Sequence, residues 1–307
     1  MGKVIAVCTS EKRGVQKKEV DHIVLRAHWG IESDAHAGDW HRQVSLLDLG
    51  KITDFKNRGV DVDFGAFGEN IITEGFDWRQ IPVDTQIRIG DCVLALTQIG
   101  KECHDHCAIY HAVGDCIMPR EGVFTEVIKG GTIRKGDAIS LLPLDPARPF
   151  SAAVITLSDR AFEKKYTDES GPLIKKELGK AGYRVVEQIL IPDHAGLLKQ
   201  HLIRLADQRF VNVIFTTGGT GFSARDITPE TTEQVCEKKA YGIAEALRME
   251  SLKITPKAML SRQTAGIRKQ TLIINLPGSP KACKENLDIV LPVLDHGLGI
   301  LRGTDTD

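Results

Sequence analysis

Residues 216–230 read TTGGTGFSARDITPE, and this stretch decides the fold of the second half of the chain. It follows the apolar run VNVIFTT (residues 211–217), which predicts a buried strand. It ends in Thr-Pro-Glu, which predicts a helix with Thr228 as its N-cap and Pro229 at its first position. Glycines let a backbone approach a ligand closely and turn its N–H groups inward, which suits a phosphate. The loop matches neither a Walker motif nor a dinucleotide fingerprint, and a tight turn without a ligand is the alternative.

Strands and helices alternate around this loop. Strands are predicted at 152–158, 183–192, 211–217 and 271–276. A helix is predicted at 171–182, with Pro172 near its start and Gly182 past its end, and a second at 195–208. This alternation predicts an α/β domain with a mostly parallel sheet and helices on both faces. The second helix places one apolar stripe against the sheet, formed by Leu198, Leu202 and Leu205.

Ligands of such sheets bind beyond the carboxyl ends of the strands. Three loops are expected there: LSDR (157–160), the glycine-rich loop, and LPGSP (276–280). Asp193 follows another strand, and Asp226 lies beside the glycine-rich loop. Carboxylates hold Mg²⁺ and backbone amides hold phosphates, so the pair predicts a metal site for phosphoryl or nucleotidyl transfer. Taken singly, each aspartate would be a helix cap or a turn residue.

The first half has a different pattern. Short apolar runs recur at 3–9, 43–47, 69–75, 86–100 and 132–142, and Gly-Asp pairs at 90–91, 114–115 and 136–137 predict tight turns. Many short strands predict a mostly-β barrel or sandwich. Pro143, Pro146 and Pro149 interrupt the pattern, so we expect domains at 1–145 and 151–307 with a linker at 146–150.

Composition narrows the class of protein. The net charge of −1 gives no sign of a nucleic-acid or membrane partner. We found no apolar run of about 18 residues and no signal peptide, so we expect a cytoplasmic protein. Clustered cysteines then indicate metal or thiol chemistry rather than disulfides. Three cysteines and three histidines lie between Cys103 and Cys116, and a zinc site, a reactive thiolate and buried inert thiols all remain open. His36, His41 and Arg42 gather near Asp34, a mixture that suits an anionic ligand.

The second half resembles the MogA/MoaB-type molybdopterin adenylyltransferases. The resemblance rests on TLSDRA, ILIPD, TTGGTG, RDITPE and LSRQTAGIRKQTLIINLPGSPKA, in family order over nearly all of residues 151–307. It implies a three-layer α/β sandwich, usually trimeric, that joins AMP from Mg-ATP to the terminal phosphate of molybdopterin and releases pyrophosphate. Phe222 and Ser223 depart from the usual Pro and Ala.

The resemblance also implies the site residues. Asp193 and Asp226 match the two functional aspartates, which would hold Mg²⁺. The remaining positions would bind molybdopterin or ATP: Thr217, Gly218, Gly219, Thr220, Gly221, Ser158, Asp159, Ser261, Arg262, Pro277, Gly278, Ser279 and Pro280.

Residues 3–142 resemble the MOSC domain, the β-barrel at the ends of molybdenum-cofactor sulfurases. The matching stretches include HRQVSLL, FGENIITEG and MPREGVF. The resemblance implies binding of molybdenum cofactor and transport of sulfur, with Cys103 at the family's single functional cysteine and Asp34, His36, His41 and Arg42 near the ligand. Ser33 stands where members usually carry Gly, so a disturbed turn is expected there.

The leading hypothesis is therefore a molybdopterin adenylyltransferase fused to a MOSC domain, working beside other proteins of molybdenum cofactor synthesis. The alternatives are a cofactor carrier without turnover and a thiol-based or zinc-dependent sulfurtransferase using Cys103. Because both aspartates are present, the enzyme ranks above the carrier.

Overall fold

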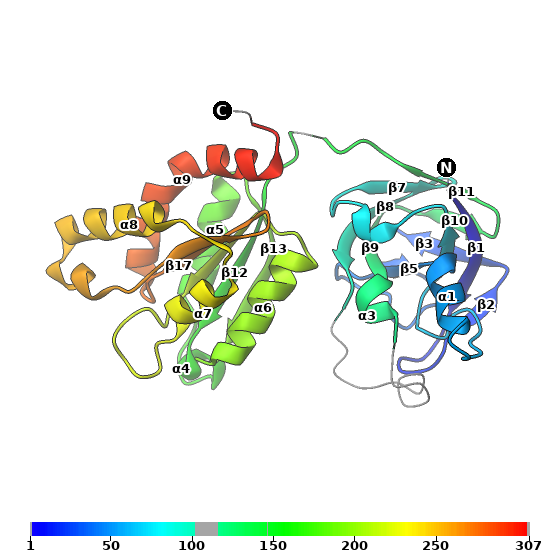
Figure 1. The fold of residues 1–307 in the computed structure, drawn as a ribbon, viewed down its shortest axis with the longest axis horizontal. Coiled ribbons are helices and arrows are strands. Elements are labelled where there is room, and N and C mark those ends of the chain that lie inside the picture. The colour runs from blue at the N-terminus through cyan, green and yellow to red at the C-terminus, as the bar shows by residue number, and fades with distance from the viewer. Residues whose placement is uncertain (1, 102–115, 146, 306–307) are drawn as a thin grey trace. The chain divides into compact units, whose positions relative to one another are not determined.

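The computed structural model describes residues 2–101, 116–145 and 147–305. It contains two compact units, Met1–Asp145 and Pro146–Asp307 (Figure 1). The described part of the expected linker is bound to the second unit, because Arg302 donates hydrogen bonds to the carbonyls of Arg148 at 2.8 Å and Pro149 at 3.3 Å. Within the described residues, no helix has the length and apolar character needed to cross a membrane.

The first unit is a closed seven-stranded barrel. Its ring is closed by the antiparallel pairing of β1 (Gly2–Thr9) with β11 (Ala138–Leu141). Closure leaves the ring without a free strand edge. The other five strands, in order around the ring, are β7 (Gln86–Ile89), β8 (Cys92–Ile99), β9 (Val123–Lys129), β5 (Val44–Asp48) and β6 (Ile71–Glu74). The expected barrel is confirmed.

Smaller elements complete this unit. Strand β2 (Lys18–Val20) pairs with β1, and β10 (Gly131–Arg134), β3 (His22–Arg26) and β4 (Gly30–Ile31) form a separate sheet. Helix α1 (Leu49–Lys56) buries Ile52 and Phe55 against the barrel, and α3 (Met118–Glu121) and a 3-10 helix (Trp78–Gln80) are short. Both Gly-Asp turns within the described residues are present, with Gly90 at φ +56° and Gly136 at φ +91°.

The second unit is built on a six-stranded sheet. Its strands, in spatial order, are β13 (Arg184–Ile191), β12 (Ser151–Leu157), β14 (Val213–Thr217), β17 (Thr271–Leu276), β16 (Ala265–Arg268) and β15 (Lys238–Lys239). The first four are parallel, as expected, whereas β16 and β15 are antiparallel additions. Only two residues join β16 to β17, and a connection that short can make only a hairpin.

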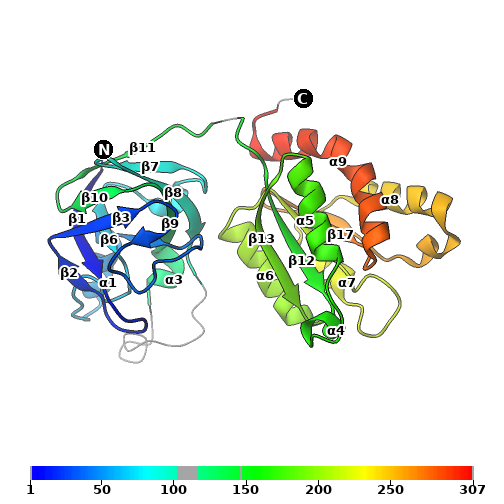
Figure 2. The same ribbon diagram turned by 180° about the vertical axis from the view of Figure 1, so that it is seen from behind.

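Helices pack on both faces of this sheet (Figures 1 and 2). Ala152 and Val154 of β12 face a core that includes α5 (Ser170–Lys180), α8 (Tyr241–Ile254) and α9 (Pro280–Arg302). Their neighbours along the strand, Ala153 and Ile155, face a second core with α6 (Ala195–Asp207) and α7 (Thr228–Val235). Each fully buried aliphatic side chain contributes about 1.5–3 kcal/mol, so the cores on the two faces fix the positions of the loops at the sheet's carboxyl edge.

Several predictions about the helices are confirmed and some elements were missed. Leu198, Leu202 and Leu205 are fully buried on α6, and α5 ends before Gly182, which has φ +89°. Helices α4 (Asp159–Phe162), α8 and α9 and strands β15 and β16 were not predicted. The strand at 271–276 ends in the expected turn at 277–279, and α9 begins directly after it, with Ser279 as its N-cap.

Candidate functional site

The glycine-rich loop leaves the carboxyl end of β14 in a conformation that only glycine adopts easily. Gly218 has φ +95° and Gly219 has φ +64°. A Cβ atom on Gly218 would lie 2.3 Å from the carbonyl oxygen of Leu157, and one on Gly219 would lie 2.5 Å from Oγ1 of Thr228. Both distances are too short for packed carbon atoms, so the loop lies tightly between β12 and the start of α7 and leaves no room there for a side chain.

Two threonine hydroxyls donate hydrogen bonds that hold the glycine-rich loop in place. Thr217, which is buried, donates to the carbonyl of Pro277 at 2.6 Å. Thr228 donates to the carbonyl of Gly218 at 2.9 Å. The expectation that Thr228 is an N-cap is wrong, because α7 begins at Thr228 and Ile227 is the preceding cap residue. Its buried hydroxyl instead donates to the loop, which gives this buried donor the partner it needs.

Arg262 holds the other end of the loop. Its Nε donates to the carbonyl of Gly221 at 2.6 Å, and one Nη donates to the carbonyl of Asp226 at 2.9 Å. Its other Nη pairs with Glu230 on α7. The guanidinium therefore uses its donors on backbone carbonyls and one carboxylate, which is a positioning arrangement.

Two aspartates contact each other beside the loop, and a third lies beside its last glycine. The carboxylate of Asp193 accepts a hydrogen bond from the backbone N–H of Asp159 at 3.1 Å, and the carboxylate of Asp159 accepts one from the N–H of Asp193 at 3.0 Å. A Cβ atom on Gly219 would lie 3.4 Å from Oδ1 of Asp193, and one on Gly221 would lie 2.9 Å from Oδ2 of Asp226. Asp193 and Asp226 thus lie beside two different glycines of one loop, although they come from separate segments of the chain.

The proximity of these carboxylates affects their ionisation. Burial raises the pKa of Asp193, and the negative charges of Asp159 and Asp226 raise it further. The N–H of Asp159 and the charge of Arg225 act in the opposite direction. Asp193 is therefore a carboxylate whose negative charge would be stabilised by an added cation.

The other predicted residues of this unit lie around the same edge. Ser158 and Ser279 are N-caps, accepting from Ala161 N at 3.2 Å and Ala282 N at 3.2 Å. Gly278 approaches the loop closely, since a Cβ atom on it would lie 3.6 Å from Cα of Gly218. The remaining members are Thr220, whose carbonyl accepts from Arg262 N, Ser261, whose hydroxyl accepts from Gln263 N, and Pro280, which begins α9.

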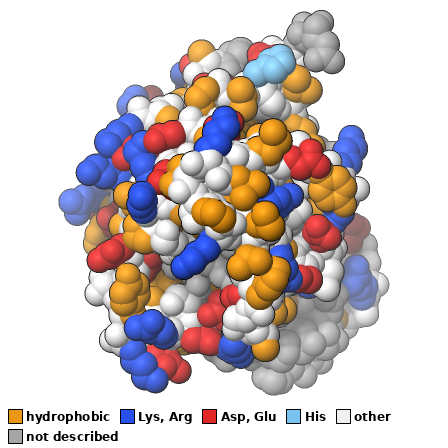
Figure 3. All heavy atoms as spheres, turned by 90° about the vertical axis from the view of Figure 1, so that its left-hand side faces the viewer, with side chains coloured by type: hydrophobic (Ala, Val, Ile, Leu, Met, Phe, Trp, Pro, Cys, Tyr) orange, Lys and Arg blue, Asp and Glu red, His pale blue; other side chains and the backbone are white. Residues whose placement is uncertain are grey.

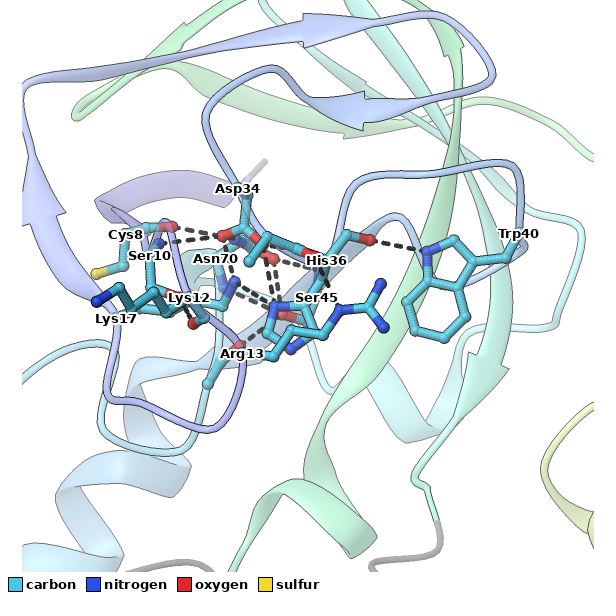
Figure 4. Close-up of polar contacts among 12 residues, drawn as sticks. Cys8, Ser10, Lys12, Arg13, Lys17, Asp34, His36, Trp40, Ser45 and Asn70 are labelled. Atoms are coloured by element: carbon cyan, nitrogen blue, oxygen red, sulfur yellow. Dashed lines mark hydrogen bonds and ion pairs between the residues drawn. The ribbon is translucent and has the colours of Figure 1, made fainter.

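A second constellation lies in the barrel, centred on a buried carboxylate (Figure 4). Asp34 is paired with Lys17, and both side chains are at most 2% exposed. Asn70 donates to Asp34 at 2.9 Å, and His36 contacts it through its backbone N–H at 2.9 Å and its Nδ1 at 3.1 Å. Burial alone would raise the pKa of Asp34, but the hydrogen bonds from His36 and Lys17 hold it well below its ordinary value. Asp34 is therefore ionised and organises the surrounding side chains.

A cavity of about 370 Å³ lies above this network. Four basic side chains line it, which gives it a cationic wall suited to an anionic ligand. Apolar side chains, among them Ala66, Phe67 and Phe124, also line it. The basic residues are Lys17, His36, Arg42 and Lys101.

The structure brings most of the predicted barrel residues together. His36 and Arg42 line the cavity and Asp34 lies beneath it. Arg42 packs over the ring of Trp40 at 4.8 Å. His41, by contrast, is not among the residues that line the cavity, and its backbone carbonyl accepts from Oγ1 of Thr97 on β8. Ser33 does not adopt positive φ, and the disturbed turn expected there stays a prediction. Cys103 and the rest of the segment 102–115 lie outside the described residues, and elsewhere in the described chain no group of three metal-binding side chains forms.

Sequence reasoning missed three polar residues of these sites. Arg225 pairs with Asp159, 66 residues away in the chain. Lys17 and Asn70 complete the buried network in the barrel. Lys17 lies in the charged run EKRGVQKKEV, which resembles a solvated surface segment, and only the position of Asp34 reveals its role.

The fold and its loops define the class of protein. The second unit is an α/β domain with a glycine-rich loop and carboxylates at the carboxyl edge of its sheet, and the first is a barrel with a cavity that basic side chains line. Two protein-family models match the chain: a probable molybdopterin binding domain at residues 153–296 and the MOSC domain at residues 33–140.

Known proteins match the second half. A molybdopterin adenylyltransferase of Helicobacter pylori is 43% identical over 152 residues, which cover 49% of this chain and 86% of that protein. The molybdopterin adenylyltransferase of Escherichia coli is 41% identical over 47% of this chain and 77% of its own length. The structure of MoaB from Thermus thermophilus, described as a molybdopterin biosynthesis enzyme, is 40% identical, with a TM-score of 0.48, covering 50% of this chain and 97% of that one. The chain belongs to the molybdopterin adenylyltransferase family and carries a MOSC domain in its first half.

Proposed function

We propose that the second unit transfers the adenylyl group of ATP to the terminal phosphate of molybdopterin and releases pyrophosphate. The observation that carries the proposal is a glycine-rich loop with two carboxylates beside it. Gly218 and Gly219 have the positive φ of a loop whose backbone N–H groups can face a phosphate, while Asp193 lies beside Gly219 and Asp226 beside Gly221. A loop that only binds phosphate has no need of two carboxylates beside it, since they would repel an anion.

The aspartates fit a magnesium ion. Oxygen ligands are the ones that Mg²⁺ prefers, and it commonly binds through one or two carboxylates together with substrate phosphates. The raised pKa of Asp193 reflects burial and the neighbouring negative charges, which a divalent cation would offset. Asp193 and Asp226 would hold the ion. When bound, it would offset the charge that develops on the transferring phosphate.

The chain's own residues orient the reactants. In the proposed reaction an oxygen of the molybdopterin phosphate attacks the α-phosphorus of ATP. The bond from that phosphorus to the bridging oxygen breaks, and pyrophosphate leaves with the electron pair. The N–H groups of the glycine-rich loop would hold the attacking phosphate, with Thr217, Thr228 and Arg262 keeping the loop in place. No nucleophilic side chain is needed.

Mass spectrometry of the products tests this proposal. The full chain is incubated with molybdopterin and Mg-ATP, beside Asp193→Asn, Asp226→Asn and the control Asp288→Asn, an exposed position on α9. We expect adenylyl-molybdopterin from the wild type and the control, and a loss of at least about a hundredfold in the two aspartate variants. Tight molybdopterin binding without product in the wild type would instead support a carrier.

For the barrel, we propose that the cationic cavity binds molybdenum cofactor or an intermediate of its synthesis. The family resemblance further suggests that Cys103 transfers sulfur to this ligand. The basic wall of Lys17, His36, Arg42 and Lys101 supports an anionic ligand there. Arg42→Ala should weaken binding of the cofactor to the full chain, and Cys103→Ser should abolish sulfur transfer only. Equal cofactor affinity for Arg42→Ala and the wild type would contradict the assignment of this cavity.

We also propose a trimer formed through the second unit. The support is a set of exposed apolar side chains on α8 and the 3-10 helix Pro256–Leu260, where Figure 3 shows apolar and charged side chains side by side. Met249 is 64% exposed and Met259 72%. Light scattering should give three chains for the wild type and a smaller assembly for the double variant Met249→Lys, Met259→Lys; a monomeric wild type would contradict the proposal.

A further inference from the structure

Arg225 lies between the glycine-rich loop and α7 and pairs with a carboxylate of another loop. Its Nε and Nη2 donate to Oδ2 of Asp159 at 2.9 and 2.6 Å, and Nη2 also lies 2.8 Å from Oδ1. The side chain of Arg225 is 62% exposed and that of Asp159 34%. An ion pair so open to water contributes little to stability. Its position beside the site is therefore better explained by function than by folding.

Negative side chains outnumber positive ones around Arg225. Asp159 exchanges backbone hydrogen bonds with Asp193, and Asp226 is the next residue after Arg225 in the chain. The guanidinium is thus a cation in contact with one carboxylate, that of Asp159, and close to two more. A triphosphate that approaches this group of carboxylates needs positive charge on the protein side, and Arg225 carries it.

We propose that Arg225 contacts the triphosphate of ATP, exchanging its Asp159 partner for phosphate oxygens when the nucleotide binds. This inference rests on the proposed function, since it concerns the nucleotide of the same reaction. A guanidinium remains charged at every working pH and its planar donors match phosphate oxygens in pairs. The same fork already holds Asp159 in a two-pronged contact, so the donors are arranged for such an anion.

A merely structural role predicts a different pattern of mutational effects. If the Arg225–Asp159 pair only fastens two loops together, removing either partner breaks the same contact and has the same effect. If Arg225 contacts phosphate, removing it weakens nucleotide binding. Removing the charge of Asp159 then frees the guanidinium and takes away a repulsive anion, so nucleotide binding is strengthened. Asp159→Asn keeps an oxygen to accept from Asp193 N, which makes it a mild test of the pair.

Equilibrium dialysis of ATP against the full chain separates these cases, once in EDTA and once with Mg²⁺. The variants are Arg225→Ala, Arg225→Lys and Asp159→Asn. Lys165→Ala is the matched control, because Lys165 is an exposed cation near the same loop that pairs with Glu163 at 2.6 Å. Molybdopterin binding, measured separately, shows whether each variant keeps an intact loop.

We expect Arg225→Ala to raise the Kd for ATP at least about tenfold in both conditions, the loss of a charge-assisted hydrogen bond. Arg225→Lys should lie between that variant and the wild type, Asp159→Asn should bind ATP more tightly than the wild type, and Lys165→Ala should be unchanged. Equal ATP affinity for Arg225→Ala and the wild type would overturn the proposal, as would equal weakening by Arg225→Ala and Asp159→Asn. A wild type that binds molybdopterin but no ATP would contradict the proposed function itself.

Discussion

Substitution of Gly218 by alanine should destabilise the second unit more than a glycine-to-alanine change that adds backbone strain without a steric clash. The φ of +95° makes alanine strained, at a cost of about 1–2 kcal/mol. The added Cβ would also lie 2.3 Å from the carbonyl oxygen of Leu157, which belongs to the sheet and cannot move aside cheaply. Overpacking of this kind costs about 1–3 kcal/mol. Together the two effects predict a loss of about 2–5 kcal/mol in the free energy of unfolding.

Two other glycines separate the two costs. Gly182 has φ +89° with nothing within 4 Å of an added Cβ, so Gly182→Ala pays the strain alone. Gly179 lies in α5 with ordinary φ and open space, so Gly179→Ala should stabilise the helix by about 0.5–1 kcal/mol. The expected order of stability is therefore Gly179→Ala, wild type, Gly182→Ala, Gly218→Ala.

Denaturant unfolding can be assigned to each unit by two signals. The chain's 3 tryptophans, Trp29, Trp40 and Trp78, all lie in the first unit. Far-ultraviolet circular dichroism follows both units, with the long helices of the second contributing most. Gly218→Ala should move the dichroism transition to lower denaturant and leave the tryptophan fluorescence transition in place. Equal midpoints for Gly218→Ala and Gly182→Ala would refute the proposed contact with Leu157.

Two further predictions concern the barrel. Lys17→Met leaves the carboxylate of Asp34 buried without its cation, so it should lower the free energy of unfolding of the barrel by about 3–5 kcal/mol, as followed by tryptophan fluorescence. Lys18→Met, at the exposed neighbouring position, should change it little. Equal effects of the two substitutions would contradict the buried ion pair. Burial raises the pKa of Glu69 to about 7 from its ordinary 4.5, so its contribution to barrel stability is complete below pH 4.5 and is lost as pH rises through about 7. Between pH 4.5 and about 7, the free energy of unfolding of the wild-type barrel should fall by about 3 kcal/mol more than that of Glu69→Gln. Parallel profiles of unfolding free energy against pH for the two proteins would contradict the raised pKa.

Much of the architecture follows from periodicity in the sequence. The alternation of strands and helices predicted the parallel part of the second sheet, and the stripe of leucines on α6 predicted its buried face. The three-layer arrangement stays a prediction that the two cores on opposite faces support. Helix α9 was missed because its sequence contains Pro292 and two glycines, which weaken a helical pattern.

The sites were harder to predict because they depend on contacts between distant segments. The loops and aspartates were identified from their positions after strands and from family resemblance. The partner of Arg225 is 66 residues away, and Lys17 is buried only because Asp34 lies beside it. Spacing along the chain contains no information on either contact. Lysine side chains are usually exposed to water, and one becomes buried only when a partner such as a carboxylate pairs with it.

Transfer of a labelled α-phosphate tests the central claim most directly. The full chain is mixed with molybdopterin, Mg²⁺ and ATP that carries a radioactive α-phosphate, and the pterin product is separated and counted. The account predicts that the label moves to molybdopterin, with one pyrophosphate released for each label transferred and none without molybdopterin. Label that remains in ATP or appears only as free AMP would show that the glycine-rich loop binds its ligand without adenylylating it.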